Sequence, residues 1–277
     1  ERGWGLHLPA WRRVPGLAWR VVRLDLGDSR WDMTAFPARS HRVRNIVLER
    51  LPPTLLLFLS STALSLGLGI ALGTSMARRP GGLLDRGGSL AATILYGTPA
   101  WWVGSFMILL FVYTFPVFRV GALRTPGSPA SGVAAVVDYL SYLALPLLTL
   151  VLVKVWGYAY IARTMVVSTL GEDFVMSARG RGIPESAVLR RHGLRVAAPG
   201  IVTLSGQALA QSVVGDILVE KIMSRPGLGV TLFSAIGGND VALYTGIMAI
   251  VIALYCTVWF ALDLACSWLD PRIGQTQ

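Results

Sequence analysis

Five long apolar runs restrict what this chain can fold into. Each is about as long as the roughly 20 residues that cross a bilayer, and four of the five contain no charged side chain. The sequence therefore predicts an all-α polytopic membrane protein with five transmembrane helices. The predicted spans are residues 54–77, 87–118, 139–162, 196–215 and 241–262. The second run is long enough to include a re-entrant or tilted part, with Pro99 near the end of its first third.

The charge content agrees with this class. Only 14% of the residues are charged, against about 25% in soluble domains. No basic stripe interleaved with aromatic residues lies outside the membrane-flanking positions, which argues against nucleic-acid binding. Cys256, Cys266 and the three histidines have no metal-ligand spacing, so no metal site is expected.

Arginine and lysine bias sets the expected orientation. The loops 78–86 and 163–195 and the C-terminal tail hold ten basic residues, whereas the loops 119–138 and 216–240 hold four. The first group is therefore predicted to be cytoplasmic. Residues 1–50 then form an extracytoplasmic segment, and residues 51–277 form the transmembrane domain.

The N-terminal segment conflicts with this bias because it carries ten arginines of its own. Such a segment would not easily cross a membrane without help. A further span before Glu1 would remove the conflict, so we expect one more helix than this numbering contains.

Residues 163–199 form the longest charged stretch between two apolar runs. They predict two short helices that are broken at the Gly-Arg-Gly-Ile-Pro sequence of 180–184, because glycine permits a turn and Pro184 can begin a helix. The small residues Ser177, Ala178, Gly180 and Gly182 permit close approach by a partner surface. We interpret the stretch as a docking element for a soluble partner; an interfacial loop on the lipid surface is the plainer alternative.

This stretch resembles the cytoplasmic coupling loop of ABC importer permeases of the dipeptide/oligopeptide/nickel type. The similarity is specific in combination and covers essentially the whole chain. The segments that carry it are 172–183 with 188–195 and Pro199, Thr-Pro-Ala-Trp-Trp-Val-Gly at 98–104, Ser-Arg-Pro-Gly-Leu-Gly at 224–229, the ends 263–264 and 269–273, and the segments 4–9 and 24–29. The resemblance implies six spans, the first of them missing here, and a coupling loop at 163–198.

Three positions depart from the family pattern. Met176 stands where the wider importer motif has glutamate, Arg225 replaces the usual tryptophan before Pro226, and Asp216 falls where a small residue is usual. The first departure is common in the peptide-type branch. Asp216 bears on the substrate path or only on packing.

The resemblance also implies partners and a location. These are a second homologous permease subunit, two ATPase subunits or domains, an extracytoplasmic solute-binding protein and the lipid of a prokaryotic cytoplasmic (inner) membrane. Neither Lys154 nor Lys221 follows a glycine, so the chain lacks the phosphate-binding Gly-x-x-x-x-Gly-Lys-Ser/Thr motif. We therefore expect no enzyme activity and no cofactor in this chain, with ATP and Mg on the partner ATPases.

The candidate residues fall into three groups. Coupling to the ATPase is assigned to Asp173, Ala178, Arg179, Arg181 and Gly182, with Ala178 and Gly182 at the contact. Lys154, Gln207, Gln211 and Asp216 are candidates for the translocation path, although Lys154 could instead snorkel or pair with a neighbouring helix. Glu220 and Arg225 are candidates for contact with the binding protein. Ser65, Gly69 and Gly73, four residues apart, form a small-residue face explained by helix packing.

The expected function is the permease subunit of an ATP-driven importer, most readily for di- or oligopeptides. Nickel-chelate, oligosaccharide and opine uptake are alternatives within the class. A gradient-driven secondary transporter with Lys154 and Asp216 as an ion relay is an alternative from another class, and an assembly subunit without a path of its own is a third.

Overall fold

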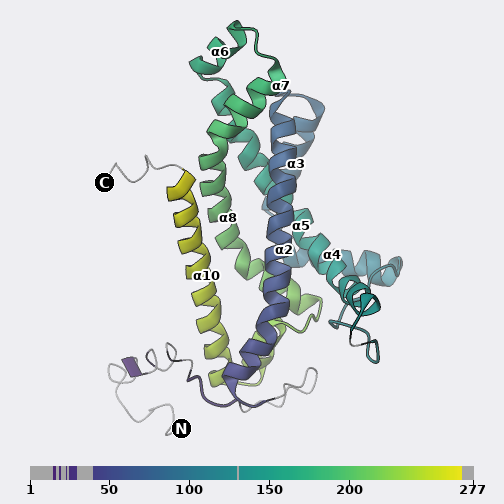
Figure 1. The fold of residues 1–277 in the computed structure, drawn as a ribbon. Coiled ribbons are helices and arrows are strands. Elements are labelled where there is room, and N and C mark those ends of the chain that lie inside the picture. Colours follow the sequence, from purple (N-terminus) through teal and green to yellow (C-terminus); the bar gives the residue numbers. More distant parts are fainter. Residues whose placement is uncertain are drawn as a thin grey trace.

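The computed structural model describes residues 15–16, 19, 23, 25–29, 40–129 and 131–269. Within these residues the regular structure is helical, as a backbone inside lipid requires. The helices are α2 (Val43–Ala77), α3 (Leu83–Tyr96), α4 (Ala100–Ile108), α5 (Val133–Leu170), α6 (Asp173–Gly180), α7 (Glu185–Ala187), α8 (Arg195–Ile222), α9 (Leu228–Gly237) and α10 (Val241–Leu269), with the π-helices η2 (Leu109–Thr114) and η3 (Val188–Leu194). Figure 1 shows α2, α5, α8 and α10 running along the bundle, with α6 and α7 together at its top.

Among the residues that the structure describes, three helices are each long and apolar enough to cross a membrane, namely α2, α5 and the 241–261 part of α10. The predicted run 87–118 is broken: α3 and the α4–η2 segment meet at an angle of 98°, and together they would make a fourth span. The break lies at Gly97–Pro99. Proline has no backbone N–H, so it cannot continue the hydrogen bonds of the preceding helical turn. Helix α8 is 28 residues long but is not among these candidate spans. The count of five therefore stays a prediction.

Helices α2 and α5 form the closest pair in the bundle, along the predicted small-residue face. Ser65, Gly69 and Gly73 are buried in α2. A Cβ atom added at Gly69 would lie 3.0 Å from the carbonyl oxygen of Val155, and one at Gly73 would collide with the carbonyl oxygen of Ala159. Only glycine lets the two backbones approach this closely, which confirms that this face serves helix packing.

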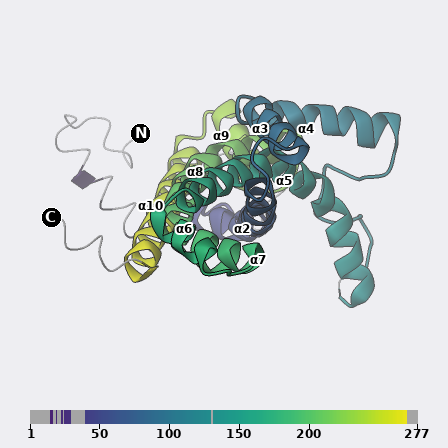
Figure 2. The same cartoon turned by 90° about the horizontal axis from the view of Figure 1, so that it is seen from above.

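Apolar side chains form three buried clusters along the bundle. One joins the start of α2 to α8, α9 and the start of α10, around Val43, Leu228 and Leu243. The second joins α2, α5 and α8 around Leu57, Leu145 and Val219, with side chains of α4 and η2 packed against it. The third joins the ends of α2 and α5 to η3 and α8. Figure 2 shows α4, η2 and the first turns of α5 extending away from the bundle.

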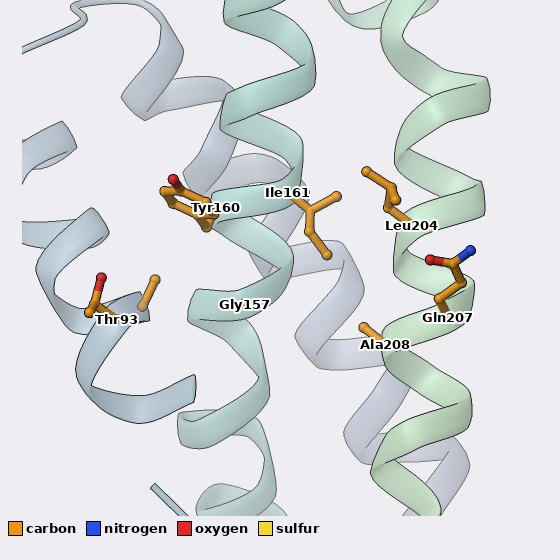
Figure 3. Close-up of a pocket in the computed structure, with 8 residues that line it drawn as sticks. Thr93, Gly157, Tyr160, Ile161, Leu204, Gln207 and Ala208 are labelled. Carbon is orange, nitrogen blue, oxygen red and sulfur yellow. The ribbon is translucent and has the colours of Figure 1, made fainter. Parts of the chain in front are cut away.

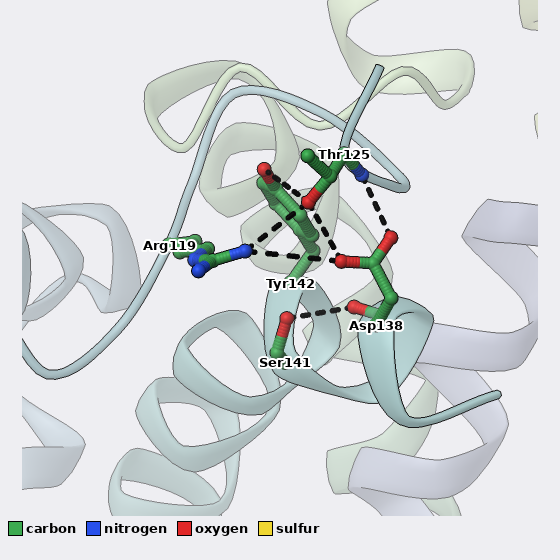
Figure 4. Close-up of polar contacts among 5 residues, drawn as sticks. All are labelled: Arg119, Thr125, Asp138, Ser141 and Tyr142. Carbon is green, nitrogen blue, oxygen red and sulfur yellow. Dashed lines mark hydrogen bonds and ion pairs between the residues drawn. The ribbon is translucent and has the colours of Figure 1, made fainter. Parts of the chain in front are cut away.

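The segment between η2 and α5 is fixed by one carboxylate (Figure 4). Asp138 accepts hydrogen bonds from the backbone N–H of Thr125 at 2.8 Å and from its hydroxyl at 2.7 Å. Arg119 donates to the Thr125 hydroxyl at 3.1 Å and lies 3.9 Å from Asp138. The connection therefore folds back on α5 instead of hanging free.

Replacing Asp138 with alanine is expected to release this connection. The two Thr125 donors lose their acceptor, and an unfastened loop is cut by protease more readily. Limited proteolysis of the purified subunit should show cleavage within residues 119–132 at a rate several-fold above that of the unchanged chain. Asp173→Ala, an exposed aspartate in α6, is the matched control and should leave that rate unchanged.

Candidate functional site

The predicted docking element is a short hairpin at one end of the bundle (Figure 1). Helix α6 begins at Asp173 and ends at Gly180, and α7 begins at Glu185, so the predicted break is confirmed, but the second helix is not short because it continues through η3 into α8. Val175 and Ala178 are fully buried against the rest of the chain. Phe174 is 42% exposed and Met176 is 65% exposed. The two side chains are two residues apart and therefore project from different sides of α6, with the Phe174 ring 6.4 Å from that of His192 in η3.

The orientation of α6 corrects the expected contact at Ala178. Its methyl group has 0% exposure and cannot meet a partner without unfolding of the hairpin. The spacing of Val175 and Ala178 places both on one face of a helix, and the chain buries that face on itself. Asp173, Arg179 and Arg181 lie exposed around the hairpin, as a contact region requires.

The turn of the hairpin has two fixed features. Gly182 is exposed with φ of +76°, a conformation that favours glycine. Arg179 donates two hydrogen bonds to Glu185, at 3.2 and 2.7 Å, and so links the end of α6 to the start of α7. These bonds hold the pKa of the Glu185 carboxyl below its usual value. Arg179 therefore acts within the chain, on the shape of the hairpin.

A groove with a volume of 510 Å³ runs across the middle of α5 (Figure 3). Its floor is α5, one wall is α3 and the other is α8. The lining residues are Ala92 and Thr93 from α3, Gly157, Tyr160 and Ile161 from α5, and Leu204, Gln207 and Ala208 from α8. Thr93, Tyr160 and Gln207 are exposed, so the polar groups of the lining can reach a molecule in the groove.

An ion pair between α5 and α8 holds one wall of the groove. Lys154 Nζ lies 2.6 Å from Asp216 Oδ2, and the two side chains are only 8% and 6% exposed. The same ammonium donates to Ser61 Oγ of α2 at 3.1 Å and lies 5.6 Å from the centre of the Phe58 ring. Of the two roles left open for Lys154, the structure supports pairing with neighbouring helices.

A second ion pair, between α5 and α3, holds the other wall. Arg163 donates from Nε and Nη2 to the two oxygens of Asp85, each at 2.8 Å. The backbone N–H of Gly81 donates to the same carboxylate, also at 2.8 Å. Since guanidinium and carboxylate match in shape, this bidentate pair fixes the angle of α3 as well as its distance.

Glu220 and Arg225, the candidates for contact with a binding protein, lie in the interior. Glu220 is 1% exposed and accepts hydrogen bonds from the Thr54 hydroxyl at 3.1 Å and from the N–H of Gly229 at 2.9 Å. Arg225 is also 1% exposed and donates to the Tyr139 hydroxyl at 2.7 Å. Glu220 links α8 to α2 and α9, and Arg225, in the connection between α8 and α9, is bonded to α5, so neither side chain is placed to contact a binding protein.

Helix α8 carries both glutamines that were predicted for the translocation path. Gln207 lies in the groove, as a path residue would. The side chain of Gln211 lies outside the described residues. The remaining lining residues, above all Tyr160 and Thr93, were not singled out from sequence. The sequence did not distinguish them, because an isolated tyrosine or threonine in an apolar run can equally well face lipid.

An open groove on a bundle of apolar helices, together with an arginine-rich hairpin at one end, is the arrangement of a multi-pass membrane protein. Comparison with known proteins places it in a particular family. Residues 69–275 match the family described as "Binding-protein-dependent transport system inner membrane component". The chain belongs to this family and is a multi-pass membrane protein.

Similar proteins agree with this placement. The chain is 28% identical over 272 residues to the oligopeptide transport system permease protein AppB of Bacillus subtilis, covering 98% of this chain and 82% of that protein. It is 30% identical over 265 residues to a protein of Brucella suis biovar 1 named as a peptide permease, covering 95% and 80%. Among solved structures, a chain of the inward-facing MetNI methionine ABC transporter has a TM-score of 0.64 at 15% identity, covering 81% of this chain and 96% of that one. That likeness shows the fold of an ABC transporter permease.

Proposed function

We propose that this chain is a permease subunit of an ATP-driven peptide importer in the inner membrane of a prokaryote. It forms the translocation path with a second permease subunit, receives peptide from an extracytoplasmic binding protein, and is driven by two ATPase subunits that hold ATP and Mg. The names of the relatives support peptide as the substrate. The five-span topology with a cytoplasmic hairpin is part of the same proposal.

The observation that carries the proposal is the pair of exposed large apolar side chains of α6. Aromatic residues and methionine are enriched at protein interfaces. Phe174 and Met176 are exposed in the hairpin at the arginine-rich end of the bundle, and neither belongs to the three buried clusters. A soluble ATPase subunit on the cytoplasmic side is the partner that this position fits.

Replacing both Phe174 and Met176 with aspartate is expected to uncouple the transporter. Two charges in the middle of a desolvated contact would lower the affinity for the ATPase subunits by at least about a hundredfold. The measurement is the amount of ATPase that copurifies with the subunit in detergent, together with transport-dependent ATP hydrolysis. Both side chains are exposed, so the subunit itself should remain folded.

The double variant Phe115→Asp/Val117→Asp is the matched control. It places the same two charges on exposed apolar residues outside the hairpin, in the connection between η2 and α5. ATPase copurification should be unchanged in this variant. Normal copurification and coupled hydrolysis in the Phe174/Met176 double variant would contradict the proposed docking.

A further inference from the structure

The lining of the groove is apolar with a few neutral polar groups. None of the lining residues that the structure describes is charged. Gln207 offers an amide that can donate and accept, Tyr160 offers a hydroxyl, and the Thr93 hydroxyl, which donates to the carbonyl of Ser89 at 3.0 Å, keeps its oxygen free to accept. Donors and acceptors of this kind complement the N–H and C=O groups that every peptide bond carries.

The charged residues that flank the groove are neutralised by the chain itself. Along α5, Lys154 precedes Gly157 by three residues and Arg163 follows Tyr160 by three, so one cation lies beyond each end of the floor. Each is paired with a carboxylate of a wall helix, Asp216 in one case and Asp85 in the other. Opposite charges in contact cancel most of each other's field at the distance of a neighbouring helical turn.

A groove built in this way exerts little net electrostatic preference on what it holds. A fixed unpaired charge would favour cargo of the opposite sign and retain it. Neutral hydrogen-bonding groups act on the peptide backbone, which is the same in every peptide, whatever its side chains. The two ion pairs thus join α5 to α8 and to α3 beside the groove. Their charges neutralise each other and do not face the transported peptide.

We propose that the Thr93–Tyr160–Gln207 groove contacts the peptide backbone through neutral hydrogen bonds and is blind to side-chain charge, so that this permease conducts acidic and basic peptides alike. This inference rests on the proposed function as a peptide permease. Gln207 is the position at which this is tested, because its neutral amide lines the groove and can be exchanged for a residue of either charge.

The test measures the uptake ratio of two peptides, Ala-Lys-Ala and Ala-Glu-Ala, in cells whose own copy of this chain is replaced by each variant. The binding protein is the same throughout, so its preference cancels when ratios are compared with that of the unchanged chain. Gln207→Glu should raise the basic-to-acidic ratio by about tenfold, and Gln207→Lys should lower it by about tenfold. Thr93→Asp, on the opposite wall, should change the ratio in the same direction as Gln207→Glu.

Gln207→Met is the matched neutral control: it removes the hydrogen bonds without adding charge and should lower both fluxes while leaving the ratio unchanged. The outcomes separate the two levels of the proposal. If both charged Gln207 variants transport both peptides at the unchanged ratio, the cargo does not contact this groove and the inference is wrong. If the unchanged chain takes up neither peptide, the proposed function is wrong and the inference falls with it.

Discussion

Replacing Lys154 alone with methionine is expected to lower the free energy of unfolding by about 3–5 kcal/mol, one of the two largest effects that the structure predicts. The substitution leaves the Asp216 carboxylate buried with its 2.6 Å partner gone. The Ser61 hydroxyl on α2 loses its contact with the ammonium as well. Because Lys154 lies between α2, α5 and α8, the variant should show a lower unfolding temperature in detergent and a lower yield from the membrane.

The double variant Lys154→Met/Asp216→Leu, which removes both charges, is compared with the single variant. Exchanging a buried ion pair for apolar side chains of similar size is often neutral or stabilising, so most of the loss should be recovered. In the secondary-transporter alternative, Lys154 and Asp216 form the ion relay. ATP-driven uptake by the double variant at near the unchanged rate would exclude such a relay. A double variant that is as stable as the unchanged chain but transports nothing would contradict a purely structural role.

Replacing Gly73 with alanine should be nearly as damaging. The added methyl group would meet the Ala159 carbonyl oxygen and would lie 2.8 Å from the Ala162 side chain and 2.9 Å from the Arg163 nitrogen. Two of these three neighbours are backbone atoms, which cannot rotate away, so α2 and α5 must separate. Overpacking of this kind costs about 1–3 kcal/mol or more, and separation would also disturb the Arg163–Asp85 pair that follows.

Gly67→Ala is a control on the same helix. A Cβ atom at Gly67 would meet nothing within 4 Å. Since alanine favours the helical state over glycine by about 1 kcal/mol, this variant should be neutral or slightly stabilised. Thermal unfolding of the two purified variants in one detergent compares them directly. Equal unfolding temperatures would show that the close contact between α2 and α5 does not limit stability.

Much of the fold could be predicted because it depends on local patterns. Apolar runs of membrane-span length predicted α2, α5 and α10, and the glycines and proline of 180–184 predicted the break between α6 and α7. The rotation of α6 could not be predicted in the same way. The small size of Ala178 suits close contact with a partner and equally suits burial against η3, and only the packing of the hairpin distinguishes the two.

The site was less predictable because its parts are distant in sequence. Asp216 and Lys154 were each noticed as charges in apolar surroundings, but nothing in sequence joins residues that are 62 positions apart. Asp85 sits in a basic loop, where an acidic residue is unremarkable, and its pairing with Arg163 depends on how α3 folds back along α5. The sequence allowed for a re-entrant or tilted part near Pro99 in the run 87–118, but the bend of 98° could not be predicted, since hydropathy does not register backbone geometry.

The continuity of α7, η3 and α8 has a mechanical consequence. From Glu185 to Ile222 the chain is helical without interruption, a length on the order of 55 Å at about 1.5 Å per residue. One end of this rod is joined to the α6 hairpin, and near the other end Glu220 holds the first turn of α9. A tilt of the rod would therefore displace both ends at the same time and in opposite directions, about the point where Asp216 is fastened to α5. A displacement of the α6 hairpin would then be passed to the start of α9 along a continuous helical backbone, without a relay of side chains.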